Sequence, residues 1–133
     1  MNVDSRTRVV VTGASRGIGV AIADAFQARG CEVGRLSRSG QISADVADAE
    51  SIGRALDEFG ELDVLVCNAG IAHYLPVAEM SLETVDELTR VNWLGTVYTV
   101  KAALGGMLRR GRGHIVIVSS GAGVRSFPGA AVY

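Results

Sequence analysis

The sequence predicts an α/β fold with a parallel sheet, because short apolar strands alternate with amphipathic helices along its 133 residues. The first predicted strand, residues 8–12, is a run of β-branched residues, which is typical of a strand covered on both faces. A glycine-containing turn follows this strand and opens a helix at Gly17. Right-handed βαβ crossovers along such a chain predict a doubly wound sheet with the strand order 3-2-1-4-5.

The other elements follow from helical spacing, caps and breaks. The first helix ends before Gly30, and its predicted apolar face contains Ile18, Ala21, Ile22, Ala25 and Phe26. Asp48 is the expected N-cap of a second helix, which ends at Gly60. Ser81 is the expected N-cap of one long helix over residues 82–110. The remaining strands are predicted at residues 32–37, 42–46, 62–67 and 115–119.

One connection in this scheme is unusually short. Only residues 38–41 separate the second and third strands, whereas a parallel crossover usually needs a dozen or more residues. A very short third strand is reachable by a bare loop, because about five extended residues span at most roughly 17 Å. A hairpin that turns at Gly40 is the alternative.

The composition is that of a globular domain. The formal net charge is −1, the apolar content is 48%, and the arginines are spread along the chain, so no nucleic-acid partner is expected. No apolar run approaches the roughly 18 residues of a membrane span, and the N-terminus lacks a secretory apolar region. Cys31 and Cys67 show neither metal-binding nor disulfide spacing, so no metal site is predicted. We therefore expect residues 1–133 to form one domain of a cytoplasmic protein.

A phosphate-binding turn is predicted at Thr12-Gly13-Ala14-Ser15-Arg16-Gly17-Ile18-Gly19. Its glycines permit a tight turn and the close approach of a diphosphate, which the free N–H groups of the following helix attract. A βα turn that needs glycine only for packing is the alternative interpretation. The position of the turn between a strand and a helix favours a dinucleotide-binding domain of the Rossmann type.

Further motifs follow this turn in a fixed order: Asp45-Val46, Cys67-Asn68-Ala69-Gly70, Asn92, Ser120 and Tyr133. Together with the turn they resemble the short-chain dehydrogenase/reductase family, whose motifs are a TGxxxGxG cofactor loop, an acidic-hydrophobic pair at adenine, NNAG, an asparagine, a serine and the tyrosine of YxxxK. The resemblance covers essentially the whole chain. It implies cofactor contacts at Gly13, Ser15, Arg16, Gly17, Ile18, Gly19, Asp45, Val46, Asn68, Ala69 and Gly70.

The chain departs from the family pattern at three places. Cys67 replaces the first asparagine of NNAG, and no helix fits between the second and third strands. The lysine that the family places four residues after the tyrosine lies beyond Tyr133, and Lys101 in the long helix is not a substitute for it. We therefore expect the chain to be an incomplete domain that lacks the last strands of the family.

The resemblance implies carbonyl chemistry at Ser120, Tyr133 and Asn92. Hydride transfer to a carbonyl creates an alkoxide, which the Ser120 hydroxyl would hydrogen-bond and the Tyr133 phenol would protonate. In the family the lysine favours the phenolate by its positive charge, and the asparagine supports that lysine. Taken alone, each of these residues is also explained as an ordinary strand-end serine, terminal aromatic or helix-packing asparagine.

The end of the second strand indicates which dinucleotide is preferred. NAD enzymes usually place an acidic residue there for the ribose 2′-hydroxyl, whereas this chain has Ser37 followed by Arg38. A hydroxyl and a guanidinium suit a 2′-phosphate, and Arg16 adds a second cation. NADP(H) is therefore the predicted cofactor, with solvated surface arginines as the alternative.

Three functions are compatible with these residues. The favoured one is an NADP(H)-dependent oxidoreductase that reduces a ketone or 3-oxoacyl group to a secondary alcohol, or catalyses the reverse, as a homodimer or homotetramer. Its partner would be a small carbonyl or alcohol substrate. A non-catalytic nucleotide-binding fragment is the second, because the YxxxK lysine is absent from the chain. An interaction subunit whose long helix pairs with a partner is the third.

Overall fold

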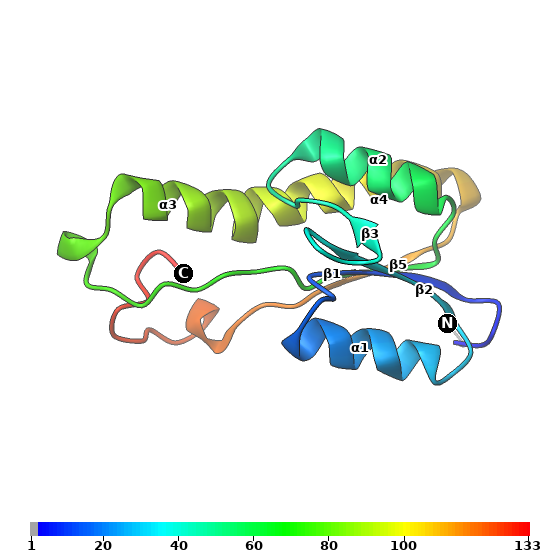
Figure 1. The fold of residues 1–133 in the computed structure, drawn as a ribbon, viewed down its shortest axis with the longest axis horizontal. Coiled ribbons are helices and arrows are strands. Elements are labelled where there is room, and N and C mark those ends of the chain that lie inside the picture. The colour runs from blue at the N-terminus through cyan, green and yellow to red at the C-terminus, as the bar shows by residue number, and fades with distance from the viewer. Residues whose placement is uncertain (1–2) are drawn as a thin grey trace.

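The computed structural model describes residues 3–133 and contains a five-stranded sheet in which all neighbouring strands are parallel. The strands are β1 (Arg8–Thr12), β2 (Glu32–Ser37), β3 (Ile42–Ser43), β4 (Val64–Cys67) and β5 (His114–Ile117), in the order β3-β2-β1-β4-β5. Helix α1 (Gly17–Gln27) covers one face, whereas α2 (Ala49–Phe59) and α4 (Gly95–Arg110) cover the other (Figure 1). The predicted fold class and strand order are confirmed.

Side chains of β1 alternate between two apolar cores. Val10 packs into the core beneath α2, together with Ile52 of that helix. Val9 and Val11 point to the opposite face and pack into the core that contains Ala23 of α1. Because helices cover both faces of the sheet, β1 needs an apolar residue at every inner position, and its continuous β-branched run provides one.

The short connection between β2 and β3 is a bare loop, as the parallel alternative predicted, and the hairpin at Gly40 is wrong. Ser37 of β2 lies beside Ser43 of β3 in parallel register. β3 contains only Ile42 and Ser43, and Ile42 lies beside Leu36, one residue before the end of β2. Residues 38–41 therefore need to carry the chain back along β2 by only about one residue. No crossover helix is required for so small a step.

β3 ends earlier than the predicted 42–46 because the chain turns at Asp45. The Asp45 carboxylate accepts the backbone N–H of Ala47 at 2.9 Å, and the Asp45 N–H donates to the Ser51 hydroxyl at 3.1 Å. Asp48 then caps α2 as predicted, accepting two backbone N–H groups. These local bonds replace the strand ladder.

The predicted continuous helix over residues 82–110 is interrupted. Helix α3 (Leu82–Leu88) is followed by a π-helical stretch, η2 (Thr89–Leu94), before α4 begins. The α-helical hydrogen-bond pattern is interrupted, but the three elements form one continuous helical rod in Figure 1. Ser81 caps α3 as expected, accepting the Thr84 N–H at 3.2 Å. A π-helical stretch widens the helix locally and is frequent at functional sites, and this one contains Asn92.

The apolar face predicted for α1 is partly wrong. Ile22 and Phe26 pack against the core, but Ile18, Ala21 and Ala25 are exposed, and Gly19 and Ala23 are the buried residues. This helix is apolar on almost every side, so spacing alone does not identify the face that meets the sheet. Close packing selects the small residues because they let α1 approach the strands.

The remaining elements are short, and the outer strands differ slightly from prediction. β4 begins two residues later than the predicted strand 62–67. β5 begins one residue earlier and ends two residues earlier than the predicted strand 115–119. Two 3-10 turns, η1 (Val77–Glu79) and η3 (Gly121–Gly123), follow β4 and β5. Within residues 3–133, no helix is both long and apolar enough to cross a bilayer.

Candidate dinucleotide site

The glycine turn between β1 and α1 has the backbone that its sequence predicts. Gly13 and Gly17 have φ values of +67° and +59°, in the left-handed region that favours glycine. A Cβ on Gly19 would overlap the carbonyl oxygen of Gly13 and lie 2.6 Å from the Asn68 amide nitrogen. Gly13 and Gly19 are therefore required by protein packing, whereas Gly17 faces open space and is required by its φ.

Thr12 joins this turn to the end of β4, and sequence reasoning did not assign it a site role. Its hydroxyl accepts the backbone N–H groups of Asn68 and Ala69 at 3.0 and 3.1 Å. The Asn68 side chain in turn donates to the backbone oxygens of Thr12 and Gly13 at 3.1 and 3.4 Å. No local sequence signal reveals this contact, because it joins the end of one strand to the end of its neighbour in the sheet.

A cleft of about 820 Å³ lies at the carboxyl ends of β1, β2 and β4. Ligands of open α/β sheets bind at this edge. Twelve residues predicted from sequence to bind the cofactor line the cleft: Gly13, Ser15, Arg16, Gly17, Ile18, Ser37, Arg38, Asp45, Val46, Asn68, Ala69 and Gly70. Gly19 does not line it and instead lies beneath the turn. Glu87, Arg90 and Val91 of the α3–η2 rod line the cleft and were not predicted.

The α1 end of the cleft is suited to a diphosphate. No side chain caps the first turn of α1, and that turn contains no acidic residue. The first N–H groups of a helix have no intrahelical acceptor, so they remain available to an anion. The unfilled helix end and the left-handed glycines together form a cradle for phosphate oxygens.

The β2 end of the cleft combines a buried hydroxyl with free cations. The Ser37 hydroxyl oxygen is buried and has no hydrogen-bond partner within the described chain. Arg16 and Arg38 are exposed and form no ion pair in residues 3–133, whereas Arg35 is held by Asp24 and Gln27 of α1. An unpaired buried hydroxyl costs free energy, which a phosphate oxygen would recover.

Asn92 ties the π-helical stretch to the loop after β4. Its side-chain oxygen accepts the Ile71 N–H, and its amide nitrogen donates to the Ile71 carbonyl, both at 2.9 Å. Asn92 does not line the cleft, although its neighbour Val91 does. Its observed contacts are structural and fix the backbone next to Gly70.

Ser120 and Tyr133 lie outside the lining of this cleft. The Ser120 oxygen accepts the Ala122 N–H at 3.1 Å as the N-cap of η3, so its own hydroxyl hydrogen remains available for donation. The Tyr133 ring packs against Tyr74, with centroids 5.8 Å apart. Within residues 3–133 no hydrogen bond joins Ser120 to Tyr133, so the structure does not bring the two hydroxyls into direct contact.

Residues 37–133 match a protein-family model described as short chain dehydrogenase. The chain belongs to the short-chain dehydrogenase family. Members of this family are oxidoreductases that use nicotinamide dinucleotide cofactors, and the free helix end, the orphaned Ser37 hydroxyl and the unpaired arginines of this chain fit such a group.

The names of individual relatives specify different substrates. The chain is 34% identical to D-threitol dehydrogenase of Mycolicibacterium smegmatis, over 84% of the chain and 51% of that protein. It is 36% identical to 2-(R)-hydroxypropyl-CoM dehydrogenase of Xanthobacter autotrophicus, over 93% of the chain and 60% of that protein. The ligand-free structure of Thermoplasma acidophilum aldohexose dehydrogenase aligns with the chain at a TM-score of 0.89 and 34% identity. The alignment covers 96% of this chain and 54% of the aldohexose dehydrogenase chain. The chain thus spans little more than half the length of these relatives.

Cys67, which replaces the first asparagine of the family's NNAG motif, is a buried packing residue. Burial raises the pKa of its thiol to about 11. The thiolate is the reactive form of cysteine, so Cys67 is not a nucleophile near neutral pH.

The raised pKa of Cys67 predicts a loss of stability at alkaline pH. The unfolded thiol loses its proton near its ordinary pKa of 9.0, whereas the folded thiol keeps it until about 11, so stability falls as pH rises through this window. We expect Cys67→Ala to be less stable than the parent at pH 8 and the difference to shrink towards pH 11. Urea unfolding across that range measures it. A difference that does not change with pH would contradict the assignment.

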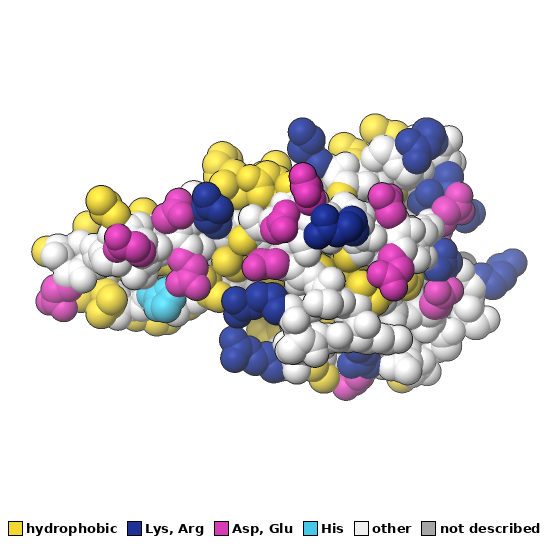
Figure 2. Space-filling view, turned by 45° about the horizontal axis from the view of Figure 1, so that its top comes forward, with side chains coloured by type: hydrophobic (Ala, Val, Ile, Leu, Met, Phe, Trp, Pro, Cys, Tyr) yellow, Lys and Arg dark blue, Asp and Glu magenta, His cyan; other side chains and the backbone are white. Residues whose placement is uncertain are grey.

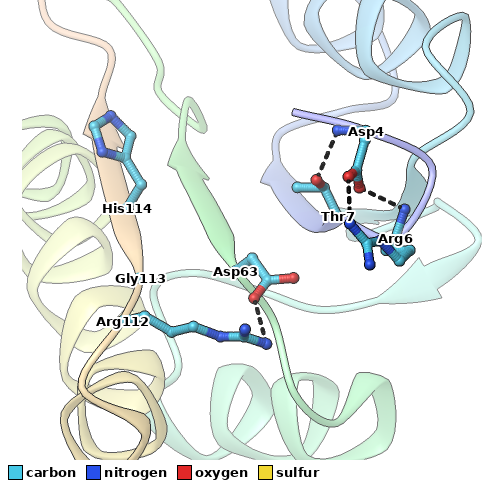
Figure 3. Close-up of a pocket in the computed structure, with 7 residues that line it drawn as sticks. All are labelled: Asp4, Arg6, Thr7, Asp63, Arg112, Gly113 and His114. Carbon is cyan, nitrogen blue, oxygen red and sulfur yellow. Dashed lines mark hydrogen bonds and ion pairs between the residues drawn. The ribbon is translucent and has the colours of Figure 1, made fainter. Parts of the chain in front are cut away.

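A second pocket, of about 660 Å³, lies at the opposite edge of the sheet (Figure 3). It is lined by Asp4, Arg6, Thr7, Asp63, Arg112, Gly113 and His114, which precede or begin β1, β4 and β5. Its arginines face carboxylates, with Arg6 3.1 Å from Asp4 and Arg112 3.4 Å from Asp63. These charges are mutually satisfied, unlike those of Arg16 and Arg38 in the larger cleft, which form no ion pair within residues 3–133.

Proposed function

We propose that the chain is the dinucleotide-binding part of an NADP(H)-dependent oxidoreductase that reduces a ketone or 3-oxoacyl group to a secondary alcohol, or catalyses the reverse. One observation carries the choice of cofactor. The cleft has an orphaned Ser37 hydroxyl and the unpaired guanidinium group of Arg38 at the end of β2, where a carboxylate would favour NAD, and it is also lined by the unpaired Arg16 at the start of α1. Guanidinium groups match phosphate geometry better than they match a ribose hydroxyl.

Different residues of the cleft would bind different parts of the cofactor. The N–H groups at the start of α1 would hold the diphosphate, and Asp45 with Val46 would lie against the adenine. Asn68, Ala69 and Gly70 would line the cofactor at the end of β4, fixed in place by Thr12. When bound, the nicotinamide ring exchanges a hydride with the substrate carbon.

The catalytic hydroxyls supply the proton chemistry. Ser120 would donate its free hydroxyl hydrogen to the substrate oxygen, because its oxygen is already used as an acceptor by Ala122. Tyr133 would donate its phenolic proton as charge develops on that oxygen, and accept it in the reverse reaction. Asn92 would act indirectly, by fixing the loop at Ile71.

A non-catalytic nucleotide-binding role is the second candidate. It is favoured by the absence of a hydrogen bond between Ser120 and Tyr133 in the described residues and by the position of both residues outside the lining of the cleft. Cofactor binding without turnover would support it.

We also propose that two copies pair through the outer face of the α3–η2–α4 rod. Trp93, Val97, Leu104 and Leu108 are exposed along it at helical spacing, and Trp93 and Leu108 are 65% and 70% exposed. Hydrophobic side chains gather at the upper edge of the molecule in Figure 2. Two copies related by a two-fold axis would bury this stripe on both subunits.

The proposed compartment is the cytoplasm, where the free thiols of Cys31 and Cys67 stay reduced.

The proposed homodimer has a direct test. Leu104→Glu combined with Leu108→Glu places two like charges in each copy of the stripe, so we expect sedimentation to shift from dimer to monomer while the cofactor still binds. A dimer that survives both changes would place the interface elsewhere.

Arg38→Asp tests the choice of cofactor. Loss of a charge-assisted phosphate contact and the added repulsion should weaken NADPH binding by about 2 to 4 kcal/mol and leave NADH binding much less affected. Arg29→Asp, an equal change of charge on an exposed residue outside the cleft, is the matched control and should weaken neither. Parallel fluorescence titrations measure both cofactors. Equal losses for NADPH and NADH in Arg38→Asp would show that Arg38 does not contact the phosphate.

A further inference from the structure

The loop that follows β4 reaches from the cofactor cleft to the proposed proton donor. It begins with Asn68, Ala69 and Gly70 at the cleft and continues to Tyr74, whose ring packs against Tyr133. The two ring centroids are 5.8 Å apart and the planes are tilted by 59°. Tilted aromatic pairs at such a separation are attractive because the edge of one ring meets the face of the other.

A backbone contact holds the same two segments together. The Leu75 N–H donates to the Gly129 carbonyl at 3.0 Å. Gly129 has φ +76°, and a Cβ there would lie 3.2 Å from the Leu75 nitrogen and 3.3 Å from the Tyr74 carbonyl carbon. The segment that ends at Tyr133 therefore approaches the Tyr74 loop as closely as a glycine permits.

The Tyr74 loop is itself anchored at two points to the α3–η2 rod. Asn92 makes both of its side-chain hydrogen bonds to the backbone of Ile71, and His73 lies 3.4 Å from the Glu87 carboxylate. Tyr74 follows these anchors directly, so its backbone is fixed on the side of the cleft. Tyr133, by contrast, is 37% exposed and does not line the cleft.

We propose that Tyr74 is a positioning residue for Tyr133: its ring orients the phenol ring relative to the cofactor loop. This inference rests on the proposed function. A general acid must be held within hydrogen-bond reach of the substrate oxygen, and small misorientations of a catalytic group are costly. Tyr74 supplies the orientation by ring packing, so its hydroxyl is not required.

The kinetic test compares the parent protein with variants at Tyr74 and Tyr133. Tyr74→Ala should lower kcat for ketone reduction between about threefold and tenfold and leave the KM for NADPH unchanged. Tyr74→Phe should restore most of the lost rate, because it retains the ring. When Tyr133 is already phenylalanine, Tyr74→Ala should have little further effect. An unchanged kcat in Tyr74→Ala, or additive losses in the double variant, would overturn the proposal.

A structural readout separates this proposal from the proposed function. The chain has three tyrosines, Tyr74, Tyr98 and Tyr133, so ring-labelled tyrosine gives three assignable NMR signals. We expect the Tyr133 signal to carry a ring-current shift that Tyr74→Ala removes and Tyr74→Phe keeps. Absence of that shift would overturn the ring contact and the proposal with it. If the parent protein shows the shift but reduces no ketone, the ring contact stands and the proposed function is overturned. The role of Tyr74 in catalysis is then overturned with it.

Discussion

Tyr133→Phe should lower the turnover of carbonyl reduction by roughly two to four powers of ten and leave NADPH affinity nearly unchanged. The substitution keeps the ring that packs against Tyr74 and removes only the hydroxyl. The hydroxyl is proposed to act as charge develops on the substrate oxygen, so its loss should affect the chemical step and not ground-state binding. Single-turnover loss of NADPH absorbance measures that step directly.

Ser120→Ala is the companion variant for this result. It should also slow hydride transfer with cofactor affinity retained, because Ser120 is proposed to donate to the same oxygen. It also removes the acceptor for the Ala122 N–H, so its thermal unfolding should be followed in parallel. A Tyr133→Phe protein that reduces its ketone at the parent rate would remove Tyr133 from catalysis and favour the non-catalytic nucleotide-binding role.

Gly19→Ala should destabilise the fold by about 3 kcal/mol and abolish cofactor binding. The new Cβ would overlap the Gly13 carbonyl oxygen, which is backbone and cannot swing away, and would press on the Asn68 amide. Asn68 holds the turn through the carbonyls of Thr12 and Gly13, so the cradle for the diphosphate would be distorted together with the packing. Urea unfolding and NADPH titration measure the two consequences.

Gly53→Ala is the matched control for this prediction. Gly53 lies inside α2, and a Cβ there meets nothing within 4 Å. Alanine is the better helix former, so this variant should gain about 0.5 to 1 kcal/mol and bind cofactor normally. A Gly19→Ala protein as stable as the parent would show that the turn does not need the close approach seen between Gly19 and Gly13.

The parts of the fold that follow from local pattern were predictable. β1 and β2 have the predicted bounds, and β1 is the clearer case, because a strand buried on both faces leaves a continuous apolar signature. Asp48 and Ser81 cap their helices as expected, since an N-cap bond reaches only two or three residues along the chain. Twelve of the thirteen residues predicted to bind the cofactor line one cleft, because parallel strands carry their carboxyl ends to one edge of the sheet.

What sequence reasoning missed depends on contacts between distant segments. Asn92 in the π-helical stretch forms two hydrogen bonds with the backbone of Ile71, which lies 21 residues earlier in the chain. Sequence periodicity does not reveal such a contact. Thr12 bonds Asn68 across 56 residues, so its role appears only when β1 and β4 are side by side. The exposure of Ile18 likewise depends on which side of α1 meets the sheet.

The central claim is that the cleft at the carboxyl edge of the sheet binds a dinucleotide that carries a 2′-phosphate. It is tested most directly by titrating the parent protein with NADPH and then displacing it with adenosine 2′,5′-bisphosphate or with adenosine 5′-monophosphate. We expect saturable binding of one NADPH per chain, and displacement by the bisphosphate at least about tenfold more effective than by the monophosphate, because only the bisphosphate carries the 2′-phosphate that is proposed to meet Ser37 and Arg38. No saturable binding, or equal displacement by the two fragments, would contradict the account.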